Sequence, residues 1–224
     1  MTLEQGIKVG VLAAKHPLST RVFARHQIDF CCGGGQPLDR VCREKGLDPD
    51  RILAEITQEL EGPTESPTSW LRAPLPDLVS HILNQHHEPL VEELPRLEGM
   101  ARKVLAVHGE KDPERLEELL TVFVALRQDL EQHMREEETA LFPLILAGRA
   151  PGMEMLDGMR EEHEAVGHML ARLNQLTDGY RVPAAACNTW RALWHGLAAL
   201  EPSLHEHIHL ENNILFPRAI AEAH

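Results

Sequence analysis

The sequence predicts an all-α protein in which a small N-terminal helical domain precedes an antiparallel four-helix bundle. Aromatic residues make up only 4% of the 224 residues, and Leu, Ala and Glu are plentiful, which favours helices over a β-sandwich or barrel. After residue 74, four long stretches of helical periodicity are separated by the breakers GEKDP, GRAPG and TDGYRVP. Because these connections are short, consecutive helices are expected to be antiparallel neighbours.

The domain division rests on EGPTESPTS at residues 61–69, which is rich in Pro, Ser and Thr and has no apolar periodicity. We expect an N-terminal domain over residues 1–61, a linker over 62–73 and the bundle over 74–224. Short helices are predicted at 9–14, 21–26 and 38–43, and another follows Asp48 as N-cap with Pro49 in its first position. The bundle helices are predicted at 75–107, 113–146, 153–176 and 183–221.

Charge and composition exclude several function classes. The formal net charge of −13 argues against a nucleic-acid backbone or an anionic membrane as partner. No apolar run approaches the roughly 20 residues needed to cross a bilayer, and the N-terminus lacks the apolar core of a secretory signal. The four cysteines do not form the pattern of a disulfide framework, so a reducing cytoplasm is the expected compartment.

Two stretches of the bundle are nearly the same: HMREEETALFP from His133 and HIHLENNILFP from His207. Each places a His four residues before a Glu, and both residues fall on the apolar stripe that faces the core. The third helix carries His163 on its stripe, and the first has two candidates, His86 and His87, that periodicity does not separate. Apolar residues flank these positions on every helix.

Buried carboxylates are very costly unless they are paired or bound to a cation, and few Lys or Arg residues fall in phase to neutralise Glu137 and Glu211. The alternative explanation is that these histidines are structural core residues held by hydrogen bonds. That explanation becomes weaker when all four helices carry such residues on their apolar stripes. Six imidazole and carboxylate ligands are too many for a tetrahedral zinc site, and calcium prefers oxygen ligands. Two metal ions bridged by Glu137 and Glu211, each also bound by two of the four histidines, would account for all six ligands. Nitrogen and oxygen ligands favour iron, and manganese is the next candidate.

Other polar residues lie near the predicted site in sequence. Asp129, one turn before His133, and Glu162, beside His163, could orient an imidazole or relay a proton, although a solvated carboxylate explains each equally well. His205 and His209 lie off the stripe and are expected to be solvated. The remaining histidines and cysteines outside the glycine loop are interpreted as surface or packing residues: His81, His108, His195, Cys42 and Cys187.

Together, these motifs resemble a known family. The repeated stretches, REEHEAVG from Arg160 and IDFCCGGG from Ile28 resemble the hemerythrin-like di-iron proteins of iron–sulfur cluster repair, the Repair of Iron Centres or ScdA/YtfE family. The resemblance covers nearly the whole chain and favours His87 over His86. It implies that two iron ions are held by four His and two bridging Glu: His87, His133, His163, His207, Glu137 and Glu211.

One departure separates the chain from oxygen-carrying hemerythrins. Those carriers have a second His one turn after the third-helix ligand, where this chain has Gly167, and they end with an Asp at a wider spacing, where this chain has Glu211. With fewer imidazoles the metal should exchange and react more readily, which argues against reversible oxygen carriage.

The glycine-rich CCGGGQP segment is expected to form a loop, since three glycines disfavour a helix. Cys31 and Cys32 are poor packing residues but reactive ones, because the thiolate binds metals and attacks electrophiles. Burial in a turn is an equally good explanation from the residues alone. The resemblance favours a redox or metal-relay role.

Three functions are considered, the first two of which the resemblance suggests. The leading one is repair of iron–sulfur clusters damaged by nitrosative or oxidative stress, by iron donation to the damaged cluster proteins. The second is enzymatic reduction of nitric oxide, and the third is an iron or oxygen sensor, so whether the protein is an enzyme stays open. Nitric oxide or oxygen would be the small ligands, and adjacent cysteines in a loop could also join two chains into a homodimer.

Overall fold

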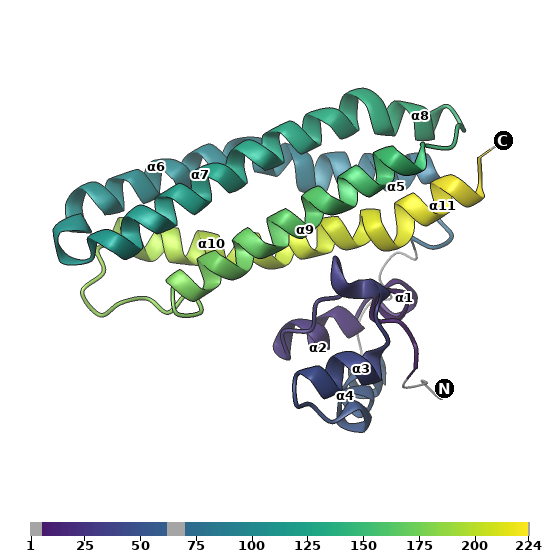
Figure 1. The fold of residues 1–224 in the computed structure, drawn as a ribbon, viewed down its shortest axis with the longest axis horizontal. Coiled ribbons are helices and arrows are strands. Elements are labelled where there is room, and N and C mark those ends of the chain that lie inside the picture. The colour runs from purple at the N-terminus through teal and green to yellow at the C-terminus, as the bar shows by residue number, and fades with distance from the viewer. Residues whose placement is uncertain (1–5, 62–69, 224) are drawn as a thin grey trace.

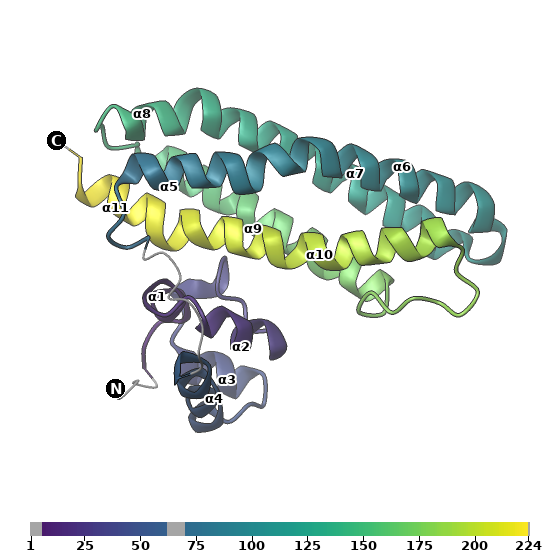
Figure 2. The same cartoon turned by 180° about the vertical axis from the view of Figure 1, so that it is seen from behind.

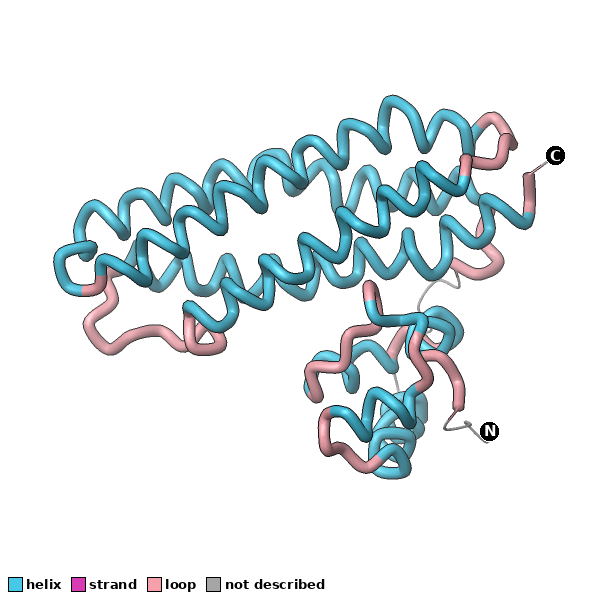
Figure 3. Tube along the Cα trace, viewed as in Figure 1, coloured by secondary structure: helices cyan, strands magenta, loops and turns pink. Residues whose placement is uncertain are grey.

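The computed structural model describes residues 6–61 and 70–223. Within those ranges the chain forms helices and loops and contains no β-strand, as Figure 3 shows, so the all-α prediction is confirmed. Among the residues that the structure describes, one β-bridge joins Lys8 to Pro37. No helix in the described part of the chain is both long enough and apolar enough to cross a membrane.

Four short helices and a 3₁₀ turn make the N-terminal domain. They are α1 (Val9–Lys15), α2 (Ser19–Arg25), the 3₁₀ turn η1 (Gly33–Gly35), α3 (Leu38–Glu44) and α4 (Pro49–Glu61). The Asp48 side chain accepts a hydrogen bond from the backbone N–H of Asp50 at 3.0 Å, which is the N-cap expected before Pro49. The glycine segment was expected to avoid helix entirely, but Gly33–Gly35 makes one 3₁₀ turn.

Four long arms make the bundle, and three of them change helix type along their length (Figure 1). The first arm is α5 (Leu75–Ile82), the π-helical turn η2 (Leu83–His87) and α6 (Glu88–His108). A 3₁₀ turn, η3 (Gly109–Lys111), leads to the second arm of α7 (Pro113–Glu136), η4 (Glu137–Leu141) and α8 (Phe142–Leu146). The third is α9 (Met153–Leu176), and the fourth is α10 (Asn188–Leu210), η5 (Glu211–Leu215) and α11 (Phe216–Ala221).

The bundle core consists of two apolar clusters. One is built around residues such as Leu94, Phe123 and Trp194, and the other around residues such as Ile82, Phe142 and Phe216. On the first and third arms His87 and His163 fall, in sequence, between these two clusters, and on the second and fourth arms the His and Glu of the repeated motif lie where one cluster gives way to the other. Packing from both sides therefore fixes the backbone where the polar side chains enter the core.

The N-terminal domain has its own core and lies against one long side of the bundle (Figures 1 and 2). Helix α1 contacts α10 and η5. At this contact the two domains approach closely, since a Cβ added to Gly34 would lie 2.9 Å from the Oδ1 of Asn213 in η5. This docking brings the loop that carries Cys31 and Cys32 to the outer face of the metal-ligand region.

Candidate metal centre

Six ionisable side chains converge in the middle of the bundle, and all are at most 3% exposed. Each arm contributes at least one of them, and the two arms with the repeated motif contribute two each. The six are His87, His133, Glu137, His163, His207 and Glu211.

Their ligand atoms form two overlapping groups of four, each with its atoms within 4.8 Å of one another. One group contains His87 and His207, and the other contains His133 and His163. Glu137 and Glu211 belong to both groups. Each group could hold a metal ion, and the two groups have both carboxylates in common.

The imidazoles face one another through Nε2. His133 and His163 approach to 2.9 Å between their Nε2 atoms, and His87 and His207 to 3.1 Å. His133 donates from Nδ1 to Glu162 at 2.6 Å, and His163 donates from Nδ1 to Asn212 at 3.0 Å. In a neutral imidazole that donates from Nδ1, Nε2 carries a lone pair. Two such lone pairs repel at 2.9 Å unless a positive charge lies between them.

The two shared carboxylates are incompletely hydrogen-bonded. Neither oxygen of Glu137 has a hydrogen-bond partner among the described residues, nor does Oε2 of Glu211. The His87 Nε2 lies 3.3 Å from Glu137 Oε2, and the His163 Nε2 lies 3.2 Å from Glu211 Oε2, close enough for ion pairing although not aligned for hydrogen bonds. Buried carboxylates without donors are costly, so this donor set fits metal ions well.

The protonation states of the metal-free site follow from these contacts. Burial lowers the pKa of His133, but the negative charge of Glu137 and the hydrogen bond to Glu162 outweigh it and raise that pKa to about 9. Burial raises the pKa of Glu211, yet His207 and His163 hold it well below its usual range. Protons therefore supply part of the positive charge that the carboxylates require.

Three of the arms widen into a π-helical turn at the ligands. The N–H groups of Glu88, Phe142 and Phe216 donate to carbonyls five residues earlier, those of Leu83, Glu137 and Glu211. A proline follows each of these donors, and a proline ring inside an α-helix collides with the carbonyl four residues back. The wider turn relieves that collision, and such π turns are frequent at functional sites. Proline alone does not cause the turn, because Pro95 and Pro202 lie inside regular α-helix.

The two candidates on the first arm are separated by the structure. His87 lies in a ligand group and donates from Nδ1 to Glu138 at 2.9 Å. His86 lies in neither group; its ring stacks on that of His207 at 5.1 Å between centroids. Burial lowers the pKa of His86 to about 3, so its ring is uncharged and packs beside the site.

Several other expectations need correction. Asp129 is exposed and forms no hydrogen bond or ion pair with His133 in the described structure, whereas Glu162 accepts a hydrogen bond from it. His209 was expected to be solvated, but it is buried, and its ring lies edge-on to Phe30 at 5.5 Å. His205 is only partly exposed for the same reason. Cys187 was expected to pack, but it is exposed and its sulfur lies 3.3 Å from the His108 Nε2.

The residues that support the ligands were partly missed from the sequence. Glu138 accepts an N–H from His87 and Asn212 one from His163, and each directly follows one of the two shared glutamates in the repeated motif. Their place one residue after Glu137 and Glu211 is a signal that could have identified them, because a metal-bound imidazole usually donates its other N–H to an oxygen.

The predicted cysteine pair lies outside the bundle core but touches it. Cys31 is buried, Cys32 is partly exposed, and their sulfurs are 3.7 Å apart. The Cys32 thiol donates to the backbone carbonyl of His163 at 3.3 Å. The pKa of Cys31 is raised by the neighbouring Cys32 thiol, by burial and by the Asp29 carboxylate. The Cys31 thiol therefore stays protonated when no cation is bound.

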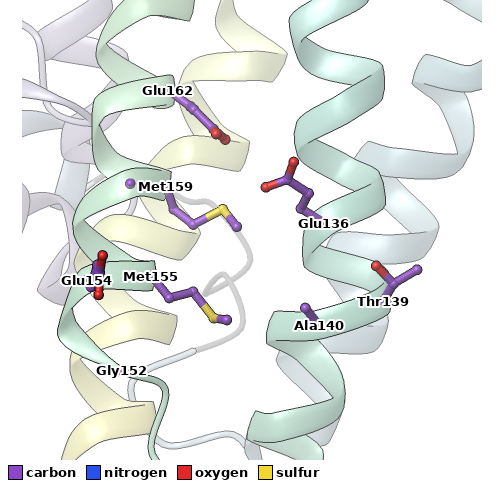
Figure 4. Close-up of a pocket in the computed structure, with 9 residues that line it drawn as sticks. Glu136, Thr139, Ala140, Gly152, Glu154, Met155, Met159 and Glu162 are labelled. Atoms are coloured by element: carbon purple, nitrogen blue, oxygen red, sulfur yellow. The ribbon is translucent and has the colours of Figure 1, made fainter.

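A hollow of about 540 Å³ opens beside the site between α9 and the second arm. Figure 4 shows the carboxylates of Glu162 and Glu136 facing each other across it, with the Met155 and Met159 thioethers also projecting inward. Glu162 therefore links solvent to the buried ligand His133 through one hydrogen bond.

Comparisons with known proteins agree with this architecture. The family model of the hemerythrin HHE cation binding domain matches residues 78–219, and that of ScdA_N, a domain of unknown function, matches residues 5–60. Two proteins named iron-sulfur cluster repair protein YtfE, from Yersinia pseudotuberculosis serotype IB (strain PB1/+) and Yersinia pestis (strain Pestoides F), are each 43% identical over 215 residues. These matches cover 95% of this chain and 96% of each relative. The chain therefore belongs to the ScdA/YtfE family of iron–sulfur cluster repair proteins, with a hemerythrin-like cation-binding domain.

Proposed function

We propose that this protein holds two iron ions in the bundle and supplies iron for the repair of damaged iron–sulfur clusters. The observation that carries the proposal is the pair of four-residue ligand groups that share Glu137 and Glu211. Imidazole and carboxylate donors without sulfur suit iron. The names of the relatives support the repair function.

In this proposal the ligands are His87 and His207 for one ion and His133 and His163 for the other. Bound iron would be a labile cargo held by nitrogen and carboxylate oxygen. The chain's part is to present four Nε2 atoms toward the centre and to hold three of the imidazoles, those of His87, His133 and His163, by Nδ1 hydrogen bonds. Glu137 and Glu211 neutralise the cations in a region closed to water.

Release of the cargo is favoured by the exposure of two supporting carboxylates. The side chains of Glu138 and Glu162 are 47% and 45% exposed, although the imidazoles they orient are buried. Water and protons can reach both carboxylates, and a proton on either would weaken the hydrogen bond that fixes its imidazole. We propose that iron leaves past Glu162 or toward the cysteine loop, where Cys31 and Cys32 act as a metal or redox relay.

The partners would be proteins with damaged iron–sulfur clusters. Four free cysteines in the described chain fit a reducing compartment, and we propose the cytoplasm. Nitric oxide and oxygen are the candidate small ligands of the metal site.

The test begins with the full chain loaded anaerobically with Fe²⁺ and analysed for iron per chain. Two irons per chain are expected, with fewer after substitution of a bridging glutamate. Loaded protein is then mixed with an apo-ferredoxin, sulfide and a reductant, with and without an Fe²⁺ chelator. Cluster formation that outpaces free Fe²⁺ under the chelator supports donation, and cluster formation that the chelator abolishes overturns it.

The same preparation tests the enzymatic alternative. Nitric oxide and an electron donor are added without any cluster protein, and the product gas is counted per chain. Many turnovers per chain, with no iron transferred in the first assay, would replace iron donation by nitric oxide reduction. Consumption of at most about one nitric oxide per iron leaves donation as the function.

A further inference from the structure

We propose that Asp29, Cys31 and Cys32 form a separate metal site on the N-terminal domain, which takes one divalent cation such as Fe²⁺ or Zn²⁺. Their ligand atoms lie within 4.8 Å of one another, outside both bundle groups. The inference deepens the proposed function, since it names the first ligands that iron leaving the bundle on this side would meet. The site itself depends only on the three side chains.

The sulfur positions already match those of a metal–thiolate site. The Sγ atoms of Cys31 and Cys32 are 3.7 Å apart. In a tetrahedral site with metal–sulfur bonds of about 2.3 Å, two sulfurs lie about 3.8 Å apart. The Asp29 Oδ1 lies 3.2 Å from the Cys31 sulfur, so a carboxylate oxygen is available as a third ligand of a tetrahedral site. A divalent cation can enter with little movement of the donors.

The loop is held in this shape by its own backbone. The Asp29 carboxylate accepts hydrogen bonds from the N–H groups of Cys31, Cys32 and Gly33 at 2.9, 3.0 and 2.8 Å. A Cβ on Gly33 would lie 3.0 Å from Asp29 Oδ2, so the glycine leaves space for the carboxylate to fold over the loop. These bonds fix Asp29 toward both thiols and pre-organise the three donors.

The bundle also holds the loop. Asn213, in the turn η5 that begins at Glu211, donates to the carbonyls of Phe30 and Cys31 at 3.1 and 3.3 Å. The Phe30 ring packs edge-on against His209 at 5.5 Å. A site anchored at both its backbone and its neighbouring ring costs little entropy to organise on binding.

The site lies directly against a predicted bundle ligand. The Cys32 thiol donates to the backbone carbonyl of His163, and a Cβ on Gly167 would lie 3.6 Å from the Cys32 sulfur. Gly167, one turn after His163, thus leaves the space in which Cys32 reaches helix α9. A cation moving between the two sites would pass from imidazole and carboxylate donors to thiolate donors within one turn of α9.

Binding is a ligand exchange without electron transfer. Two metal–sulfur bonds and one metal–oxygen bond form, the cation loses bound water, and the two thiol protons pass to solvent. The Cys31 thiol now donates to Asp29 and the Cys32 thiol to the His163 carbonyl, and both protons are lost when the sulfurs bind the cation. Thiolate ligands therefore become available as the metal arrives.

The test uses Co²⁺ as probe on the full chain, reduced with a phosphine under anaerobic conditions and loaded beforehand with only the Fe²⁺ that the bundle binds, excess Fe²⁺ being removed. The exposed Cys187 beside His108 is replaced in the parent (Cys187→Ser), which removes an unrelated thiol–imidazole pair. A thiolate-to-cobalt charge-transfer band in the near ultraviolet reports only sulfur ligation, and the bundle ligands contain no sulfur. We expect one equivalent of Co²⁺ to develop the band.

The Cys31→Ser and Cys32→Ser variants should each lose at least half of the band, and the double variant all of it. Asp29→Asn should weaken Co²⁺ binding by about tenfold or more. Cys42→Ala, in the core of the same domain, is the matched control and should keep the band. Circular dichroism melting shows which variants are folded, and Asp29→Asn tests the site even if a serine variant unfolds.

A band that survives in the folded double variant, or no band in the reduced parent, overturns the inference. The two proposals fail separately. A protein that transfers iron normally but shows no band has a repair function without this site. A protein that shows the band but transfers no iron has the site without the proposed repair function.

Discussion

The Nδ1 of His133 donates a 2.6 Å hydrogen bond to Oε2 of Glu162, across the gap between α7 and α9. This bond turns the His133 Nε2 lone pair toward the centre, 2.9 Å from the Nε2 of His163. It also connects a buried ligand to a half-exposed carboxylate at the edge of the hollow in Figure 4. The strength with which this ligand holds metal should therefore depend on a residue that touches solvent.

We expect Glu162→Gln to weaken iron binding by about 10- to 100-fold, because the neutral amide orients His133 but no longer strengthens its basicity. Competition with an Fe²⁺ chelator measures the change. Glu161→Gln is the control, since Glu161 is an exposed neighbour on the same helix. Equal chelator competition in the two variants would contradict the role of Glu162.

A second prediction concerns the shared carboxylate Glu137, neither of whose oxygens has a hydrogen-bond donor in the described structure. Glu137→Gln should lower the iron content from two per chain to one or fewer. Because a bound ligand stabilises the folded state by RT ln(1 + [L]/Kd), the rise in melting temperature on adding Fe²⁺ should shrink by half or more. Glu164→Gln on the exposed face of α9 should keep the full rise. A full rise in the Glu137 variant would argue against bridging.

The bundle could be predicted from the sequence because each arm repeats its apolar positions over many turns and ends at Gly- or Pro-containing breakers. The predicted third helix, 153–176, coincides with α9. The fourth begins at Asn188 rather than at residue 183, since the stretch after TDGYRVP is a loop. The converging ligands were predictable for the same reason: a charged residue in an apolar stripe is costly and therefore conspicuous.

The contact between the two domains was not predictable from periodicity. A helical pattern assigns a residue to the inner or outer face of its own bundle, so His209 was placed in solvent. The N-terminal domain covers that outer face, where burial lowers the pKa of His209 to about 4. The π-helical turns were missed for a related reason, since they depend on how proline is accommodated in the packed arm and not on proline alone.

The metal-free site should make stability depend on pH. The pKa of His133 in the folded chain is about 9, above its ordinary value of about 6.5. A raised pKa stabilises the fold fully below pH 6.5, and this contribution is lost as the pH rises through 9. Melting of metal-free protein between pH 6.5 and 9 should show a steady decrease in stability. A flat profile would contradict the His133 assignment.

Iron binding should depend on pH in the opposite sense over the same window. A metal ligand must be deprotonated, so binding to His133 releases a proton below pH 9. Apparent affinity should increase by up to about tenfold per pH unit from 6.5 to 9, as measured by anaerobic calorimetry in two buffers of different ionisation enthalpy. In Glu137→Gln the slope should decrease, because the charge that raises this pKa is gone.

The last prediction concerns the anchor between the domains. Asn213→Ala removes the donors to the carbonyls of Phe30 and Cys31, and an unsatisfied buried carbonyl costs about 1–3 kcal/mol. Cys31 is buried, so its alkylation requires the loop to open, and the alkylation rate should rise by about tenfold or more. Mass spectrometry of the Cys31 peptide in iron-loaded protein measures that rate. Asn188→Ala, at the exposed start of α10, should leave it unchanged. If both variants are alkylated at the parental rate while iron content is retained, Asn213 does not hold the cysteine loop against the metal-binding bundle.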